Sequence, residues 1–219
     1  MDARLTHLDF THVFYDPSDL LSLPLAISSL IPQLILVVYT TQFFCRREIE
    51  TCLMVAGQVL SELLNELLKS VIRQPRPHLE LGSGYGMPSA HAQFMAFYAA
   101  YLTAWTLAHA HFSPLKKALR ITWVVGLCAL VSYSRVYLNY HTPAQVAVGI
   151  AVGVLFGLGW HRAVLFMRWI GLVDWVLDHV FLADWFYVKD SAATSGSFVE
   201  DEYAQWKKQR AATRSKKAQ

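Results

Sequence analysis

The chain has 219 residues, of which 54% are hydrophobic and only 16% are charged, and its formal net charge is +3. A soluble domain carries about 25% charged residues, so this composition excludes an ordinary soluble domain and indicates a polytopic membrane protein. The modest charge, without a basic stripe of interleaved aromatic residues, also argues against nucleic acid as a partner.

Apolar segments that can cross the hydrocarbon core of a bilayer follow one another along the chain. We expect an all-α fold with about five transmembrane helices of roughly 20 residues each. The predicted helices have these approximate bounds: 23–44, 49–71, 91–112, 119–137 and 143–167. The last one carries Gly149, Gly153 and Gly157 at four-residue spacing. Small residues at this spacing let helices approach closely in lipid, so we expect this helix to pack tightly against a neighbour.

Two further segments follow the last predicted helix. Trp169, Trp175 and Trp185 stand among acidic residues, and tryptophan favours the membrane–water interface. We therefore expect an interfacial amphipathic segment as far as residue 188. From there the chain is rich in serine, alanine and lysine, a composition that predicts disorder. The chain thus divides into an integral-membrane domain over 1–188 and a basic tail over 189–219.

The distribution of basic residues predicts the orientation in the membrane. Short cytoplasmic loops of membrane proteins are enriched in Lys and Arg. The loops after the first and third predicted helices and the exit of the fifth hold Arg46, Arg47, Lys116, Lys117, Arg120, Arg162 and Arg168. With alternating spans these residues share one side, which we expect to be cytoplasmic, together with the C-terminal tail. The loops after the second and fourth helices then face the opposite side.

Three clusters of cations and histidines adjoin those two opposite-side loops. The first holds Lys69, in the last turn of the second helix, and Arg76, which stands between Pro75 and Pro77. Proline ends the helix and stiffens the turn. A planar guanidinium suits phosphate oxygens, and an ammonium beside it acts as a point charge. Each residue alone could instead be a helix-end cation that reaches for the headgroup layer.

The second cluster is Pro88-Ser89-Ala90-His91, immediately before the third predicted helix. Ser89 is an N-cap candidate, and the free backbone N–H groups of the following turn form an anion site. His91 would then stand beside the bound anion. The same residues also fit a plain helix cap followed by an interfacial histidine.

The third cluster joins Arg135, at the end of the fourth helix, to His141, just before the fifth. Thr142, Pro143 and Gln145 form a capping-box pattern, which gives Gln145 a purely structural explanation. Gln145 also follows His141 by four residues, so its amide could hydrogen-bond the imidazole and orient it. An amide lacks the negative charge that would stabilise an imidazolium. The cap and the orienting contact can coexist.

Alternating helices bring the three clusters to one membrane face, where they can form a single pocket. Three cations can offset the charge of a phosphoryl group in its transition state without a metal. One histidine can attack phosphorus while the other protonates the leaving oxygen. Glu80 alone is insufficient for a divalent metal, so we expect neither a metal nor another cofactor.

These spacings resemble the type 2 phosphatidic acid phosphatase (PAP2) superfamily. The matching residues run from Lys69 and Arg76-Pro77 through Pro88-Ser89-Ala90-His91 to Ser134-Arg135 and His141. The resemblance implies a PAP2-type helical bundle in which His141 is the nucleophile that forms a phosphohistidine. It implies that His91 is the general acid for the leaving group. It further implies that the phosphate is bound by Lys69, Arg76, Ser89 and Arg135.

The sequence departs from the family at Gln145, where the family has the aspartate that orients the nucleophile. Residues 85–94, with Ser134-Arg135-Val136-Tyr137 and His141-Thr142, are similar to the dolichyldiphosphatase branch, in which glutamine is usual at this position. The resemblance implies hydrolysis of dolichyl (polyisoprenyl) diphosphate to dolichyl monophosphate and phosphate. It places this reaction at the lumenal face of the endoplasmic reticulum, where it recycles the carrier lipid of N-glycosylation.

The C-terminal Lys216-Lys217-Ala218-Gln219 resembles a dilysine retrieval signal. Such a signal agrees with a multi-pass protein of the endoplasmic reticulum membrane with a cytoplasmic C-terminus, although a chance lysine pair would look the same. Two other functions stay open. One is a phosphatase of another lipid phosphate, such as phosphatidate or a sphingoid phosphate. The other is a catalytically inactive lipid-binding member, in which Gln145 marks lost activity.

Overall fold

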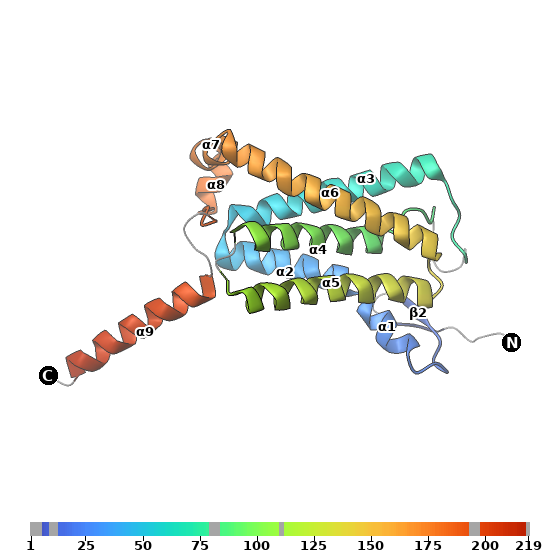
Figure 1. The fold of residues 1–219 in the computed structure, drawn as a ribbon, viewed down its shortest axis with the longest axis horizontal. Coiled ribbons are helices and arrows are strands. Elements are labelled where there is room, and N and C mark those ends of the chain that lie inside the picture. Colours follow the sequence, from blue (N-terminus) through green and yellow to red (C-terminus); the bar gives the residue numbers. More distant parts are fainter. Residues whose placement is uncertain (1–5, 9–12, 79–83, 110–111, 193–197, 218–219) are drawn as a thin grey trace.

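The computed structural model describes residues 6–8, 13–78, 84–109, 112–192 and 198–217. This part of the chain is helical except for one antiparallel hairpin near the N-terminus (Figure 1). The elements in chain order are β1 (Thr6–Leu8), β2 (Val13–Tyr15), α1 (Ser22–Ser28), α2 (Ile31–Arg46), α3 (Ile49–Ile72), α4 (Ala90–His109), α5 (Pro114–Tyr137), α6 (Pro143–Trp169), α7 (Leu172–His179), α8 (Phe181–Trp185) and α9 (Phe198–Lys217). The hairpin was not predicted. Its second strand is Val-Phe-Tyr, and such residues favour extended backbone.

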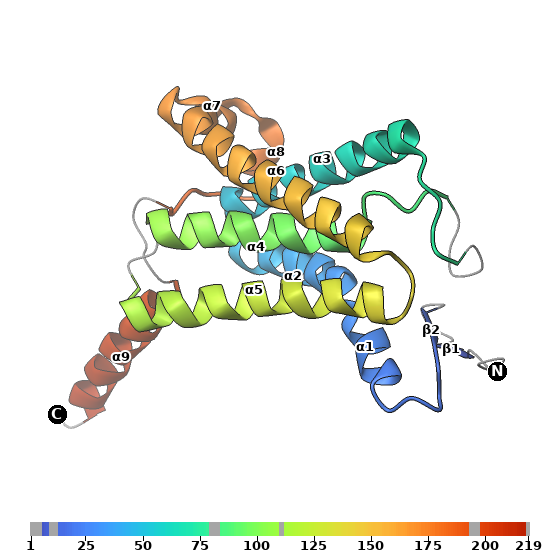
Figure 2. The ribbon, with the colours of Figure 1, turned by 45° about the vertical axis from the view of Figure 1, so that its right-hand side comes forward.

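Helix α4 lies at the centre of the bundle. It packs against α6, α5 and α3, and both ribbon views show it between α6 and α5 (Figures 1 and 2). Met95, Phe97 and Tyr101 on this helix are completely buried. The hydrophobic core therefore forms around α4, and the neighbouring helices enclose it.

The close approach of α6 to α4 depends on glycine. A Cβ atom at Gly149 would lie 2.7 Å from the Ser89 carbonyl oxygen, and one at Gly157 would lie 2.9 Å from the Phe97 carbonyl oxygen. Real Cβ atoms do not approach backbone atoms this closely. The predicted tight packing of the glycine-bearing helix is confirmed, and its neighbour is α4.

The second to fifth predicted helices correspond to α3, α4, α5 and α6. Helix α5 starts earlier than predicted because Ser113 caps it, with its Oγ accepting from the Lys116 N–H, and Pro114 occupies the first turn. The first predicted helix is broken into α1 and α2. Pro32 is at the start of α2, and its missing N–H cannot continue a helix from α1.

Hydropathy by itself identifies fewer membrane spans than the five predicted. In the described part of the chain, two helical segments are long and apolar enough to cross a membrane, Ser22–Arg46 and Pro143–Trp169. Helices α3 and α5 carry charged residues along their length, which lowers their mean hydropathy. Helix α4 contains histidine, glutamine and tyrosine, and these residues lower its mean hydropathy as well.

The C-terminal elements lie at the end of the bundle opposite the hairpin (Figure 1). Helices α7 and α8 expose Trp175, Phe181 and Trp185, as an interfacial segment would. The chain then returns to the bundle, where Arg168 on α6 forms ion pairs with Glu50 on α3 and with Asp190. These contacts hold the segment after α8 against α3 and α6.

The prediction of a disordered tail was wrong for residues 198–217, which form α9. Helix-favouring Glu, Ala, Gln, Lys and Arg fill this segment. Stacking also supports the helix, because Tyr203 packs on Trp206 and Arg210 lies over the Trp206 ring. The serine- and lysine-rich composition suggested disorder, but local propensity and these contacts favour a helix that projects from the bundle (Figure 1).

Candidate active site

The predicted site residues meet at one end of the bundle. Here α3 and α5 end and α4 and α6 begin, beside α1 and the hairpin (Figure 2). The site residues lie at these ends or in the adjoining links: Lys69, Arg76, Ser89, His91, Arg135, His141 and Gln145. Gln145 donates a hydrogen bond to the link after α3 and accepts one from the link before α4, so segments separated by some seventy residues in the sequence are in direct contact.

His141 lies in the short link between α5 and α6 and is buried. Its Nδ1 is 2.9 Å from the Gly86 carbonyl oxygen and 3.2 Å from Gln145 Oε1. Both partners are acceptors, so Nδ1 carries the proton and the imidazole is the Nδ1–H tautomer. The lone pair is therefore on Nε2, where an electrophile can meet it.

The surroundings of His141 keep its imidazole neutral. Burial lowers its pKa from 6.5 to about 4, and the positive charges of Arg135 and Arg76 act in the same direction. The contacts with Gln145 and Gly86 oppose this change but are outweighed. At neutral pH the Nε2 lone pair is consequently unprotonated.

Gln145 connects all three clusters. Its Oε1 accepts from His141 Nδ1 and from the Thr142 N–H, each at 3.2 Å. Its Nε2 donates to the Pro75 carbonyl at 2.9 Å, in the turn that carries the first cluster. Its own backbone carbonyl accepts from the Ser89 N–H at 3.1 Å. The capping box is complete, so the cap and the contact with the imidazole coexist.

Arg135 is buried in the last turn of α5, where its guanidinium carbon lies 3.8 Å from the centre of the Tyr140 ring. Tyr140 is buried as well, and its hydroxyl accepts a hydrogen bond of 2.8 Å from the Phe14 N–H on β2. Tyr137 also contacts the N-terminal segment, because its hydroxyl donates to Asp19 at 2.7 Å. The N-terminal segment thus packs on the helix end that carries Arg135.

Besides Oδ1 of Asn65, three polar atoms of the predicted site residues are buried without a hydrogen-bond partner among the described residues. They are Nε of Arg76, Oγ of Ser89 and Nε of Arg135. Burial also lowers the pKa of Arg76. Buried polar groups are nearly always paired, so three unpaired donors in one place indicate a site that receives an anion.

Lys69 lies in the last turn of α3, as predicted. Its ammonium forms an ion pair of 2.7 Å with Glu66, whose side chain is 63% exposed, while the Lys69 side chain is 13% exposed. The Glu66 side of this pair is open to solvent, which weakens it, so an incoming anion can replace the carboxylate. Arg73 caps the same helix in the left-handed region, at φ 52°.

Ser89 precedes the first residue of α4 and is fully buried, and its carbonyl accepts from the Gln93 N–H at 3.0 Å. The predicted N-cap position is correct for the backbone, but Oγ makes no cap hydrogen bond. His91 follows in the first turn and is partly exposed to a cavity. Among the charges that act on its imidazole are those of Arg135, Arg76 and Lys69.

A buried polar network between α3 and α4, which was not predicted, lies next to the second cluster. Asn65 on α3 donates to Gln93 Oε1 at 2.8 Å and lies 3.5 Å from the Pro88 carbonyl oxygen. Gln93 in turn donates to the Ser61 carbonyl at 2.7 Å. Amide side chains in the middle of apolar helices are unusual, and this signal in the sequence could have revealed the network.

Tyr140 was missed as part of the site, and the Gly86 carbonyl also belongs to it. A Cβ atom on Gly86 would lie 2.7 Å from Gln145 Nε2, so a larger residue here would displace the amide that contacts His141 and Pro75. Glu80 lies outside the described residues. Among those described, no group of three or more His, Cys, Asp or Glu side chains could hold a metal ion.

Comparisons with known proteins show which family the sequence resembles. The family model described as the PAP2 superfamily matches residues 50–169. The dolichyldiphosphatase of Saccharomyces cerevisiae is 36% identical over 214 residues, which cover 91% of this chain and 87% of that protein. Dolichyldiphosphatase 1 of Homo sapiens is 37% identical over 196 residues, or 83% of this chain and 82% of that one.

A solved structure shares the fold. It is the transmembrane PAP2 type phosphatidylglycerolphosphate phosphatase of Bacillus subtilis, with a TM-score of 0.54 and 24% identity. The match covers 64% of this chain and 73% of that chain.

Proposed function

The chain belongs to the PAP2 superfamily, and we propose that it is a membrane phosphatase that removes the terminal phosphate of dolichyl diphosphate. The relatives named dolichyldiphosphatase support this substrate, because they match the chain over most of their own length. The observation that carries the chemistry is the tautomer of His141, whose Nδ1–H bonds leave Nε2 as a nucleophile.

In the first step, His141 Nε2 attacks the terminal phosphorus of the diphosphate. The bond between this phosphorus and the bridging oxygen breaks, the phosphoryl group passes to Nε2, and dolichyl monophosphate leaves. His91 donates a proton to the departing oxygen. In the second step, His91 takes a proton from a water molecule, which attacks the phosphohistidine and releases inorganic phosphate and His141.

The remaining residues bind the phosphoryl group and hold the nucleophile. The charge that develops on the phosphoryl oxygens is offset by Lys69, Arg76 and Arg135. The Ser89 hydroxyl and the free backbone N–H groups at the start of α4 donate hydrogen bonds to the same oxygens. The unpaired atoms of Arg76, Ser89 and Arg135 support this role. Gln145 orients the imidazole through its contact with Nδ1.

We further propose that the bundle crosses the membrane five times, with α1 and α2 together forming the first span and α3 to α6 the others. Residues 1–188 then form the membrane domain, and α7 and α8 lie in the interface. The site faces the lumen of the endoplasmic reticulum, and 189–219 is cytoplasmic. The basic loops at the end opposite the site support this orientation.

The test is release of phosphate from purified protein in detergent with EDTA present. We expect turnover of polyprenyl diphosphate in preference to phosphatidate and sphingoid phosphate. The His141→Ala variant should be inactive, because it lacks the nucleophile. Preference for phosphatidate would overturn the substrate, full activity of His141→Ala would overturn the mechanism, and no turnover of any lipid phosphate would favour a binding protein.

A further inference from the structure

A cavity of about 310 Å³ opens beside His91. Its walls come from α2, α3 and α4, and none of its described lining residues belongs to α5 or α6. We propose that this cavity is the subsite for the leaving group, and that Gln33 recognises the phosphate that remains on the lipid. This inference rests on the function proposed above and adds the position of the lipid.

The in-line geometry of phosphoryl transfer indicates where the leaving group lies. In phosphoryl transfer the attacking and leaving atoms lie roughly in line on opposite sides of phosphorus. The nucleophile, His141, stands between α5 and α6, and the residue that protonates the leaving oxygen is His91 on α4. The lipid phosphate must therefore depart on the His91 side, and the cavity lies on this side.

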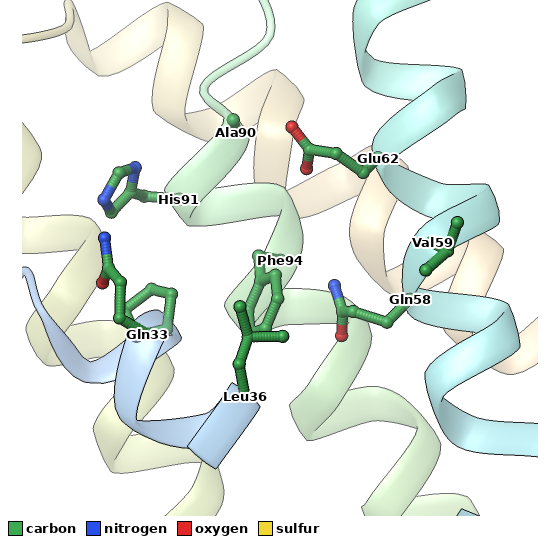
Figure 3. Close-up of a pocket in the computed structure, with 9 residues that line it drawn as sticks. Gln33, Leu36, Gln58, Val59, Glu62, Ala90, His91 and Phe94 are labelled. Atoms are coloured by element: carbon green, nitrogen blue, oxygen red, sulfur yellow. The ribbon is translucent and has the colours of Figure 1, made fainter. Parts of the chain in front are cut away.

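The lining of the cavity matches a polar group attached to a hydrocarbon chain. Gln33, near the start of α2, points toward the His91 imidazole (Figure 3). An amide N–H is a donor for phosphate oxygens. Leu36, Val59 and Phe94 line the remainder of the cavity, and their side chains suit the first prenyl units. Glu62 on the α3 wall would repel an anion, so the phosphate lies at the α2 wall, beside Gln33.

Gln58 is a second sign that the cavity receives a ligand. Its side chain is 4% exposed, and neither amide atom has a hydrogen-bond partner among the described residues. The amide points into the cavity from α3 (Figure 3). Native proteins rarely leave a buried amide unpaired, so the cavity must also hold a hydrogen-bonding group, such as water or a phosphate oxygen, within reach of Gln58.

The first experiment compares two diphosphates, one with a long polyprenyl chain and one with a single prenyl unit. Val59→Trp fills the cavity and should lose about ten times more kcat/KM with the long chain than with the short one. Leu60→Trp is the matched control, because Leu60 is a partly exposed neighbour on α3 that does not line the cavity. It should keep the wild-type ratio. Equal losses with both diphosphates in Val59→Trp would overturn the subsite.

The second experiment tests Gln33. The ratio of kcat/KM for polyprenyl diphosphate over polyprenyl monophosphate should fall about tenfold in Gln33→Leu, because one hydrogen bond to a charged phosphate is lost. Only the diphosphate places a phosphate beside Gln33, so an unchanged ratio would overturn its role.

A labelling experiment separates failure of the subsite from failure of the proposed function. A polyprenyl methylenediphosphonate, whose P–C–P link resists hydrolysis, binds without turnover and can carry a photoreactive group on its first prenyl unit. We expect it to label α3 near Val59 and α4 near Phe94. Labelling of other helices would overturn the subsite even if the protein hydrolyses dolichyl diphosphate. Labelling of these helices without hydrolysis would support the subsite and overturn the enzymatic function.

Discussion

The guanidinium of Arg135 lies over the ring of Tyr140, with 3.8 Å between its carbon and the ring centre. The Tyr140 hydroxyl is held in turn by the Phe14 N–H. A phosphate-binding cation thus rests on a ring that an N-terminal strand fixes, although 126 residues separate Phe14 from Tyr140. The family model begins at residue 50, so this support comes from outside the matched region.

The two contacts of Tyr140 predict different losses. Tyr140→Leu removes the stacking, so the inhibition constant for inorganic phosphate should rise about tenfold. Tyr140→Phe keeps the ring but leaves the Phe14 N–H unpaired, so it should cost about 1 kcal/mol of stability with phosphate affinity near wild type. Phosphate inhibition and thermal unfolding in detergent measure the two effects. A similar loss of phosphate affinity in both variants would show that the ring does not position Arg135.

The pKa of His141 predicts activity that persists in mild acid. With a pKa of about 4, the nucleophile stays unprotonated until the pH approaches that value, and the acid limb of kcat/KM should lie well below pH 6.5. Gln145→Glu places a negative charge beside the imidazole, which favours the protonated form and raises its pKa. The acid limb should then move to higher pH. A limb at the same pH in both proteins would mean that another group controls it.

The same pKa predicts how stability depends on pH. The folded-state value of about 4 lies below the ordinary 6.5, so between these values the unfolded chain binds a proton that the folded chain does not. The free energy of unfolding should fall by on the order of 3 kcal/mol as the pH decreases through this window. His141→Asn removes this contribution. Its unfolding temperature should therefore depend less on pH than that of the wild type, and parallel curves would contradict the assignment.

The contribution of His91 should depend on the leaving group. Dolichyl phosphate is itself a phosphate with a second pKa near 6, so its departing oxygen needs far less protonation than the alkoxide released from a phosphate monoester. His91→Asn should therefore reduce kcat for a lipid monoester at least about tenfold more than kcat for polyprenyl diphosphate. Single-turnover rates with both lipids provide the measurement. Equal reductions would indicate that His91 acts chiefly on the attacking water.

Two glycines on α6 offer a matched test of helix packing. A Cβ atom at Gly153 would lie 2.7 Å from Ala96 Cβ and would also meet the Gln93 carbonyl, whereas one at Gly159 would meet nothing within 4 Å. Gly153→Ala should cost about 1–3 kcal/mol through overpacking. Gly159→Ala should be neutral or stabilising, since alanine favours the helix by about 1 kcal/mol. Thermal unfolding in detergent compares them, and equal unfolding temperatures would contradict the packing of α6 on α4.

Several features could be predicted because they depend on local chemistry. Segments that are mostly apolar over about 20 residues locate α3 to α6, although among these helices only α6 is apolar enough to count as a span by hydropathy alone in the described part of the chain. The capping box at Thr142 and Gln145 follows from residue types three positions apart. Alternation of the helices across a membrane is enough to bring the ends of four helices to one face.

Other features depend on contacts between distant segments, which no local pattern records. The stacking of Arg135 on Tyr140 and the bond from Gln145 to Pro75 arise only after the helices pack. The cavity beside His91 needs α2, which lies outside the motif-bearing region. In the tail, composition pointed to disorder, while helix propensity and aromatic stacking prevailed in α9.

Gln145 joins the three clusters through an uncharged amide. Where an aspartate makes the equivalent contact, its negative charge cancels part of the field of the surrounding cations. The neutral amide cancels none of the positive charge of Lys69, Arg76 and Arg135. With the same geometry, the pocket therefore keeps a more positive electrostatic potential. A diphosphate carries more negative charge than a phosphate monoester. Exchanging a carboxylate for an amide therefore shifts the electrostatic match toward the more highly charged headgroup without moving any atom of the nucleophile.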